Sequence, residues 1–247
     1  MKVLGIIPSR YESSRFPGKP LIDIAGKSMI QRVYEQTSKS TLIHKLVVAT
    51  DDQRIFEHVK SFGGNVVMTS TKHTSGTDRC GEVIEKHTDF DIVINIQGDE
   101  PLINPNQLDD VVSLFKTEIV QIGTVVKQMT AIDDVLNPNR IKVVLDKNKN
   151  GIYFSRSPIP YVANTNQKDW LIKAKFWKHI GIYAWRMNVL KTIVKLPKTQ
   201  LEQQESLEQL RWLYNGFKIA TVETKIETPN IDVPEDIEKV LSLLKKK

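Results

Sequence analysis

The sequence predicts an α/β fold, in which helices flank a mostly parallel open sheet, and three observations support this expectation. Strand-like apolar runs alternate with amphipathic runs through the first half of the chain, which is the order of βαβ units. Residues 92–96 form a nearly continuous apolar run, as expected of a central parallel strand that is covered on both faces. The 247 residues are enough for one sizeable α/β core. The predicted sheet is therefore Rossmann-like.

The first half of the chain is expected to hold three pairs of strand and helix before that central strand. The expected strands cover residues 3–7, 46–49 and 66–68, and the expected helices cover residues 29–38, 54–62 and 82–87. Right-handed crossovers between such strands place ligands beyond the carboxyl ends of the strands. The loop of residues 9–20 and the segment QGDEP at residues 97–101 both leave the sheet by that edge. They are therefore expected to face each other across one crevice.

The second half of the chain is less regular, and we expect a small excursion lobe in it. Residues 143–145 and 152–154 are expected to pair as a hairpin around the turn sequence DKNKNG. Residues 157–178, with two prolines and four spread lysines, leave the sheet before a strand at residues 179–185. These features predict a lobe at about residues 150–200.

Two helices are expected near the end of the chain. Leu207, Leu210 and Leu213 keep helical spacing, and residues 233–247 form an amphipathic run with acidic residues in its first turn. We expect residues 1–247 to form a single domain, of which the lobe is a part.

The formal net charge of +6 does not by itself indicate a nucleic-acid partner. Lys245, Lys246 and Lys247 contribute three of these charges, and the remaining excess is mixed with acidic residues. A phosphorylated small molecule explains this excess as well as a polynucleotide does. A nucleic-acid-binding protein would show lysines and arginines clustered among aromatic residues, whereas the basic residues here are dispersed outside two places.

Cys80 is the only cysteine in the sequence, which excludes an internal disulfide and a zinc site built from cysteines. No apolar run is long enough for the core of a signal peptide or for a membrane span. We therefore expect a cytoplasmic protein with neither a membrane nor a nucleic acid as its partner.

The loop after the first expected strand, SRYESSRFPGKP at residues 9–20, combines rigidity with positive charge. Arg10, Arg15 and Lys19 lie within ten positions, Gly18 allows close backbone approach, and two prolines restrict flexibility. This composition suits a triphosphate. The loop has neither the spacing of a Walker loop nor the pattern GxGxxG, so a hydride-transfer cofactor is not supported. A surface loop with solvated basic side chains is the alternative.

Two aspartates are candidates for a magnesium site. Asp99 follows the central strand, so rigid backbone would hold its carboxylate at the sheet edge. Mg²⁺ usually takes one or two protein carboxylates together with phosphate oxygens, and Asp232, before the final helix, is the candidate partner. The alternatives are a turn residue that bonds its own backbone for Asp99 and a helix N-cap for Asp232.

Several polar segments could bind a nucleoside or a hydroxylated acid. HTSGTDR at residues 73–79 supplies hydroxyl groups at a helix start, for which a capped helix is the alternative. The other candidates are FSR at residues 154–156, KHIGIYAW at residues 178–185, and Glu208 with Gln209. A lone histidine such as His179 is more often a packing or surface residue. The pattern GxSxG is absent and no Ser-His-Asp triad can be identified, so covalent acyl transfer is not supported.

Together these segments resemble the 3-deoxy-manno-octulosonate cytidylyltransferases, also called CMP-Kdo synthetases, over nearly the whole chain. The matching stretches are IIPSRYESSRFPGKPL, VVATDD, HTSGTDR, NIQGDEP, NPNRIKVVLD, YFSRSPIP, KHIGIYAW, LEQLR and IDVPEDIEKV. Their order and spacing agree with the family, which makes the resemblance specific. Ser9 stands where an alanine is frequent in the family, a departure that removes no charged group. The resemblance implies the nucleotide-diphospho-sugar transferase fold.

The resemblance also implies roles for individual residues. Arg10 and Lys19 would contact the CTP phosphates with Arg15 nearby, Ser75, Gly76 and Arg79 would lie around the cytidine, and Gln97 would sit between nucleotide and sugar. Asp99 and Asp232 would bind Mg²⁺, and Arg10, Lys19, Asp99 and Asp232 would form the catalytic set. The acid sugar would be surrounded by Arg156, His179, Tyr183, Glu208 and Gln209.

The activity implied by the resemblance is transfer of CMP from CTP to the anomeric hydroxyl of 3-deoxy-D-manno-octulosonate (Kdo), with release of pyrophosphate. The product would be the activated sugar for lipopolysaccharide synthesis, and the lobe at about residues 150–200 would bind the sugar and support a homodimer. A related acid sugar, such as an 8-amino Kdo or a nonulosonate, is the alternative substrate. A noncatalytic partner that retains the fold is a third possibility, against which the intact charged residues argue.

Overall fold

The computed structural model describes residues 1–12 and 16–245, so Arg15, Lys246 and Lys247 lie outside the described residues. The chain divides into two compact units, one formed by Met1–Val112 with Glu227–Lys247 and the other by Ser113–Ile226. The expected single domain with a lobe at about residues 150–200 stays a prediction. None of the helices in the described ranges has the length and apolar character needed to span a membrane.

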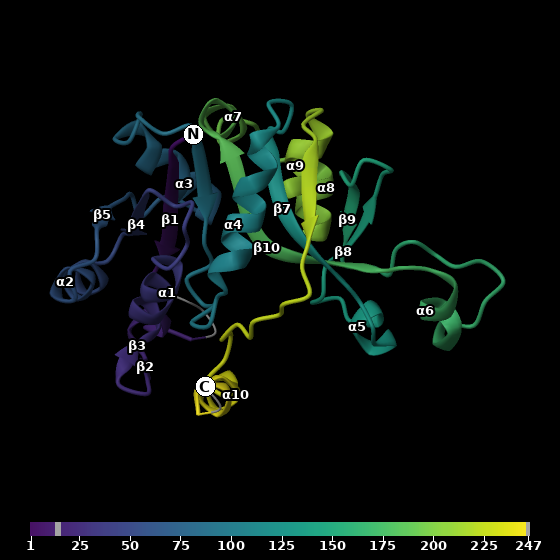
Figure 1. Ribbon diagram of the computed structural model, residues 1–247, viewed down its shortest axis with the longest axis horizontal. Coiled ribbons are helices and arrows are strands. Elements are labelled where there is room, and N and C mark those ends of the chain that lie inside the picture. Colours follow the sequence, from purple (N-terminus) through teal and green to yellow (C-terminus); the bar gives the residue numbers. More distant parts are fainter. Residues whose placement is uncertain (13–15, 246–247) are drawn as a thin grey trace. The chain divides into compact units, whose positions relative to one another are not determined.

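Parallel strands form the sheet of the first unit in the order β6–β1–β4–β5 (Figure 1). Their bounds are β1 (Val3–Ser9), β4 (Lys45–Thr50), β5 (Val66–Met68) and β6 (Ile92–Asn95). The side chains of Ile6, Val48 and Ile94 are fully buried, as expected of strands covered on both faces. The four strands expected in this half of the chain are confirmed.

The helices of the first unit follow the expected alternation with strands. They are η1 (Lys19–Leu21), α1 (Met29–Thr37), α2 (Gln53–Ser61), α3 (Gly76–Glu85), α4 (Pro105–Ser113) and α10 (Asp236–Leu244). Helix α3 begins six residues before the expected start at residue 82. The run of residues 82–87 was too short a prediction, whereas the capped helix start expected within residues 73–79 is confirmed, because the Ser75 hydroxyl accepts the N–H of Asp78 at 3.1 Å.

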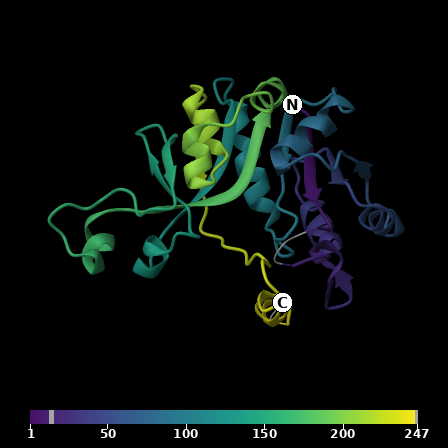
Figure 2. The ribbon, with the colours of Figure 1, turned by 180° about the vertical axis from the view of Figure 1, so that it is seen from behind.

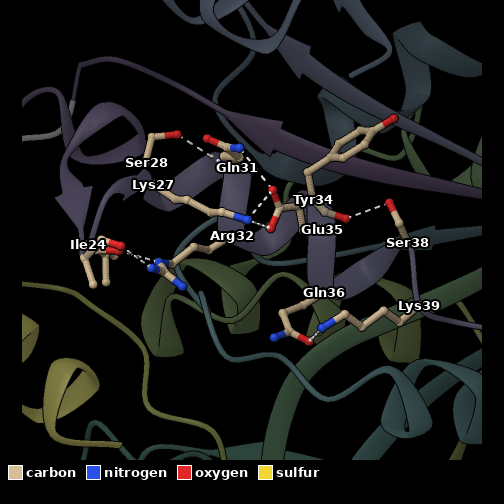
Figure 3. A network of polar contacts seen from close by, with 11 residues as sticks. Ile24, Lys27, Ser28, Gln31, Arg32, Tyr34, Glu35, Gln36, Ser38 and Lys39 are labelled. Atoms are coloured by element: carbon tan, nitrogen blue, oxygen red, sulfur yellow. Dashed lines mark hydrogen bonds and ion pairs between the residues drawn. The ribbon is translucent and has the colours of Figure 1, made fainter. Parts of the chain in front are cut away.

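A small hairpin connects the basic loop to α1, and polar contacts join the hairpin to α1 (Figure 3). The hairpin consists of β2 (Asp23–Ile24) and β3 (Lys27–Ser28). The Lys27 ammonium lies 2.6 Å from the Glu35 carboxylate, and the Arg32 guanidinium donates to the Ala25 carbonyl at 2.8 Å. These contacts join the segment that follows Lys19 to a helix of the core.

The second unit contains a mixed sheet and several short helices. Its strands are β7 (Ile122–Gln128), β8 (Lys142–Leu145), β9 (Gly151–Ser155), β10 (Trp177–Arg186) and β11 (Ile219–Glu223), in the order β11–β7–β10–β8–β9. Its helices are η2 (Leu114–Lys116), α5 (Ile132–Leu136), η3 (Gln167–Asp169), α6 (Trp170–Lys173), α7 (Met187–Ile193), α8 (Gln200–Glu205) and α9 (Gln209–Tyr214). Only β7 and β11 pair in parallel among these described strands, and the expected hairpin is confirmed as β8 and β9.

The expected excursion between β9 and β10 packs against α5 and the residue after β7 in a small apolar cluster. Trp170 on α6 stacks on Phe176 with 5.8 Å between ring centroids, and Met129 and Val135 complete the buried cluster. Figures 1 and 2 show α6 on the loop that leads back into β10, and Figure 2 shows α8 and α9 beside β9. The excursion is therefore a packed segment rather than an open linker.

Candidate active site

The backbone after β1 places the Lys19 side chain in the interior of the first unit. Gly18 adopts a left-handed conformation with φ of 72°, and its N–H donates to the Tyr11 carbonyl at 2.9 Å. A Cβ atom at this position would lie 3.1 Å from the Tyr11 hydroxyl. The turn therefore favours glycine both for its positive φ and for this close approach. Pro20 then continues η1, and the Lys19 side chain is only 16% exposed.

Lys19 joins the two aspartates that the sequence suggested as magnesium ligands. Its Nζ atom lies 2.9 Å from Asp99 Oδ2 and 3.9 Å from Asp232 Oδ1. The same ammonium donates to the Ile231 carbonyl at 2.9 Å. Two carboxylates that are separated by more than one hundred residues in the sequence therefore lie within 4 Å of one cation.

Asp99 occupies a turn whose backbone is packed tightly against β1. A Cβ atom at Gly98 would come within 2.9 Å of the Pro8 carbonyl oxygen, so this close approach requires glycine. The N–H of Ile231 donates to the Asp99 carbonyl at 2.9 Å, which ties the segment carrying Asp232 to the same turn. The rigid placement expected for Asp99 at the end of β6 follows from these contacts.

Asp232 does not cap the final helix, so that alternative is wrong. Helix α10 begins at Asp236, and the Asp236 carboxylate accepts the N–H groups of Asp232 and Val233 at 2.9 and 3.1 Å. The Asp232 carboxylate accepts from the Asn230 amide at 2.6 Å and also faces Lys19. Asp236 thus orders the backbone and leaves the Asp232 carboxylate at the site.

These groups line a polar cleft of about 500 Å³ in the first unit. Its lining residues are Pro8, Ser9, Arg10, Glu12, Lys19, Pro20, Gln97, Gly98, Asp99 and Asp232. The cleft brings together five predicted site residues, namely Arg10, Lys19, Gln97, Asp99 and Asp232. Glu12 also lines the cleft but was not predicted, because no pattern in the sequence separates it from any other loop glutamate. Arg15 falls outside the described residues.

The residues predicted around the cytidine serve as structural supports of α3. Ser75 is the N-cap described above, and Gly76 packs near Pro8, which lines the cleft. Arg79 is 1% exposed, and its guanidinium donates to Asp51 Oδ2 at 2.7 Å and to the Thr69 hydroxyl. None of the three lines the 500 Å³ cleft, and their contact with a nucleoside stays a prediction.

In the second unit, Arg156 lies at the end of β9 in a cradle of carbonyl oxygens. Its Nε donates to the Glu205 carbonyl at 2.7 Å, its Nη1 to Pro138 at 3.2 Å and its Nη2 to Ser206 at 3.5 Å. A guanidinium has five N–H donors, so each Nη keeps one N–H for another partner. The side chain is therefore oriented and still able to bind an anion.

His179 and Tyr183 lie next to each other on β10, with 5.0 Å between ring centroids. The imidazole Nε2 contacts the Thr124 hydroxyl at 2.9 Å. Burial, which is the larger cause, and the nearby Lys178 ammonium lower the pKa of His179 to about 3. Burial, which is again the larger cause, and the Glu208 carboxylate raise the pKa of Tyr183 well above its ordinary value. Both side chains are therefore neutral at ordinary pH.

Two polar groups of the predicted sugar set are buried without a hydrogen-bond partner among the described residues. They are the Tyr183 hydroxyl and the Gln209 side-chain amide nitrogen. The carboxylate of Glu208, the residue before Gln209, accepts a hydrogen bond from the Arg211 guanidinium at 2.6 Å. Buried polar groups normally have partners, so this hydroxyl and this amide could each accept a water molecule or a polar ligand as a partner.

The lowered pKa of His179 predicts that its titration destabilises the protein in acid. The unfolded chain binds a proton on this imidazole below about pH 6.5, whereas the folded chain does so only near pH 3. The stability that the neutral imidazole provides is complete above pH 6.5 and is lost as the pH falls. Urea unfolding between pH 6.5 and 5 should show a steeper loss for the wild type than for His179→Gln, by at most about 1.4 kcal/mol per pH unit. Identical slopes would contradict a neutral His179 in the folded protein.

The two carboxylates of the cleft fit the requirements of Mg²⁺ but not those of a metal held by protein ligands alone. In the part of the chain described, no group of three or more histidine, cysteine, aspartate or glutamate side chains could hold a metal ion. Mg²⁺ takes one or two protein carboxylates and completes its octahedron with water and phosphate oxygens. Asp99 and Asp232, which already share one ammonium, match that ligand set.

Comparison with known proteins gives matches over nearly the whole chain. A family model described as Cytidylyltransferase matches residues 4–223. The 3-deoxy-manno-octulosonate cytidylyltransferases of Parabacteroides distasonis and Bacteroides thetaiotaomicron are each 53% identical to this chain over 99% of its length, and the match covers 98% and 99% of those proteins.

Solved structures of cytidylyltransferases also match this chain over its whole length. The structure of CMP:2-keto-3-deoxy-manno-octonic acid synthetase complexed with CTP is 42% identical, with a TM-score of 0.93, and the match covers 100% of this chain and 99% of that one. A cytidylyltransferase from Leptospira borgpetersenii, at 17% identity and a TM-score of 0.67, shares the fold over 100% of this chain and 88% of its own. The predicted α/β fold class is confirmed.

Proposed function

Because the chain belongs to the 3-deoxy-manno-octulosonate cytidylyltransferase family, we propose that it transfers CMP from CTP to the anomeric hydroxyl of Kdo and releases pyrophosphate. The observation that carries this proposal is the convergence of Lys19, Asp99 and Asp232 on one cleft that Arg10 also lines. Such a cleft provides positive charge for a triphosphate beside two carboxylates for a divalent cation.

The main physical difficulty of this reaction is the approach of two anions. Two like charges at about 4 Å repel each other by roughly 4 kcal/mol at an effective dielectric constant of about 20. Fixed cations and hydrogen-bond donors are therefore needed where the triphosphate and the sugar carboxylate meet. Arg10 and Lys19 would supply positive charge to the departing pyrophosphate, as in other phosphoryl transfer sites.

Asp99 and Asp232 are the residues that would hold Mg²⁺. When bound, the ion supplies positive charge where negative charge develops at the α-phosphate. Lys19 at present donates to Asp99 and to the Ile231 carbonyl, so it would have to exchange at least one of these partners for a phosphate oxygen. An ammonium has three donors, which permits such an exchange without moving the backbone of η1.

The second unit carries the groups that would recognise the sugar acid. Arg156 keeps an N–H on each Nη, which suits a carboxylate, and the unpaired groups of Tyr183 and Gln209 could contact sugar hydroxyls. His179 is neutral, so it would contribute a hydrogen bond rather than a charge.

Arg156→Ala should raise the KM for Kdo by about tenfold or more, because a charge-assisted hydrogen bond to a carboxylate contributes roughly 1.5–3 kcal/mol. The CTP affinity should stay nearly unchanged. Steady-state kinetics with each substrate varied in turn measures both effects. If the dependence on Kdo concentration were unaltered, Arg156 would not belong to the sugar site.

The test of the proposed function is pyrophosphate release with CTP and Mg²⁺ against a panel of ulosonic acids. Kdo should be turned over with the highest kcat/KM, and CTP should be preferred to the other nucleoside triphosphates. Preference for an 8-amino Kdo or a nonulosonate would select the alternative substrate. No release with any acid of the panel would refute the function.

Two further parts of the proposal concern the protein in the cell. We propose that it works in the cytoplasm, which the presence of a single, buried cysteine, Cys80, and the synthesis of a nucleotide sugar from CTP support. The homodimer implied by the family is proposed as well. Sedimentation measurements of the purified protein would decide its oligomeric state.

A further inference from the structure

We propose that Glu205 is a positioning residue for Arg156, a role that rests on the proposed function because Arg156 is taken to bind the sugar carboxylate. Glu205 is the last residue of α8 and lies half-buried beside the end of β9. It contacts Arg156 through both its backbone and its side chain. No sequence motif singles it out.

The Glu205 carboxylate binds the backbone that carries Arg156. Its Oε2 accepts the backbone N–H of Arg156 at 2.9 Å, and its Oε1 accepts the Ser155 hydroxyl at 2.6 Å. The ammonium of the fully buried Lys142 donates to the Arg156 carbonyl from β8. The backbone N–H and C=O of Arg156 are thus both held by charged side chains.

The guanidinium of Arg156, in contrast, is oriented by neutral groups. Its contacts within the described residues are the carbonyls of Glu205, Pro138 and Ser206. Ser206 adopts a left-handed conformation with φ of 51°, which ends α8 next to Arg156. The end of this helix therefore supplies two of the three acceptors.

This arrangement orients the guanidinium without neutralising it. A carboxylate bonded directly to the guanidinium would compete with a carboxylate of the substrate, whereas the Glu205 carboxylate is occupied by the backbone N–H of Arg156 and the hydroxyl of Ser155. Because a small misplacement of a binding group costs much of its effect, the loss of these bonds should weaken sugar binding through Arg156.

The experiment compares Glu205→Ala, Glu205→Gln, Arg156→Ala and the double variant Glu205→Ala/Arg156→Ala in steady-state kinetics with Kdo and CTP. Glu205→Ala should raise the KM for Kdo by about tenfold and leave the KM for CTP unchanged, as expected for a displaced charged contact. Glu205→Gln, which keeps one acceptor oxygen, should restore part of the loss. In the Arg156→Ala background, Glu205→Ala should have no further effect on the KM for Kdo.

Thr199→Ala is the matched control for a general loosening of α8. Thr199 caps that helix by accepting the N–H of Glu202 at 3.3 Å. This variant should lower the melting temperature and leave the KM for Kdo unchanged. If Glu205→Ala is not recovered in folded form, Glu205→Gln decides by the same comparisons.

Several results would overturn the positioning role. They are an unchanged KM for Kdo in the Glu205 variants, an equal rise in the KM for CTP, an additive loss in the double variant, or the same effect from Thr199→Ala. Absence of Kdo turnover by the wild type would refute the proposed function and this role together. Wild-type turnover with unaffected Glu205 variants would refute the positioning role alone.

Discussion

Asp99→Asn is expected to reduce turnover at least about 100-fold while CTP still binds measurably, because a metal ligand of this kind contributes several kcal/mol to the transition state. The substitution keeps the size of the side chain and an oxygen that can still accept from Lys19. It removes the negative charge of Asp99, which together with that of Asp232 would bind a divalent cation. Binding of the nucleoside should change little, because the charge acts at the phosphate end.

Pyrophosphate release at saturating substrates measures this effect, and calorimetric titration with CTP measures binding separately. Asp23→Asn is a matched control, because Asp23 holds a hairpin turn by accepting the N–H of Gly26 at 3.1 Å and does not line the cleft. That variant should retain wild-type turnover. Near-normal activity of Asp99→Asn would rule out a catalytic role for its carboxylate.

The first unit could be predicted from the sequence because its elements repeat one local pattern. Strands β1, β4 and β6 are apolar runs that are largely buried in the sheet, so each run indicates a strand without knowledge of its neighbours. The ends of those strands also indicated where Lys19 and Asp99 would lie, since parallel strands present their carboxyl ends at one edge. Their side chains do meet, at 2.9 Å.

The local sequence suggests Asp232 as a candidate ligand but does not determine where its carboxylate lies. The residues after it read equally well as a helix start, and only the contact of Asp236 with the backbone of residues 232 and 233 shows which aspartate takes the capping role. The residue comes to the cleft through a backbone bond between Ile231 and Asp99, which links segments far apart in the chain. Local patterns carry no information about such a bond.

The second unit was harder to predict because its features depend on tertiary contacts. Strand β7 was not expected, although it pairs with both β10 and β11. Lys142 has the composition of a surface residue, yet its side chain is fully buried and donates to the carbonyls of Asn137 and Arg156. No sequence pattern marks Glu205, because the backbone N–H of Arg156 that it contacts lies about fifty residues earlier in the chain.

Lys19→Ala is expected to weaken CTP binding by about tenfold to 100-fold and to leave the binding of cytidine nearly unchanged, because the ammonium would contact phosphate alone. The loss has two physical causes. The triphosphate loses a charge-assisted donor, and it meets the carboxylates of Asp99 and Asp232 without the cation that now lies between them. The second cause makes the loss larger than that of a single hydrogen bond.

Titration of both variant and wild type with CTP, CMP and cytidine separates these contributions. The affinity loss should grow with the number of phosphates, and added Mg²⁺ should recover part of it, since the carboxylates would again be paired with positive charge. Lys27→Ala provides the control, because Lys27 pairs with Glu35 at 2.6 Å outside the cleft. Equal losses for cytidine and CTP would mean that Lys19 supports the fold of the cleft rather than the phosphates, and the convergence of charges there would need another explanation.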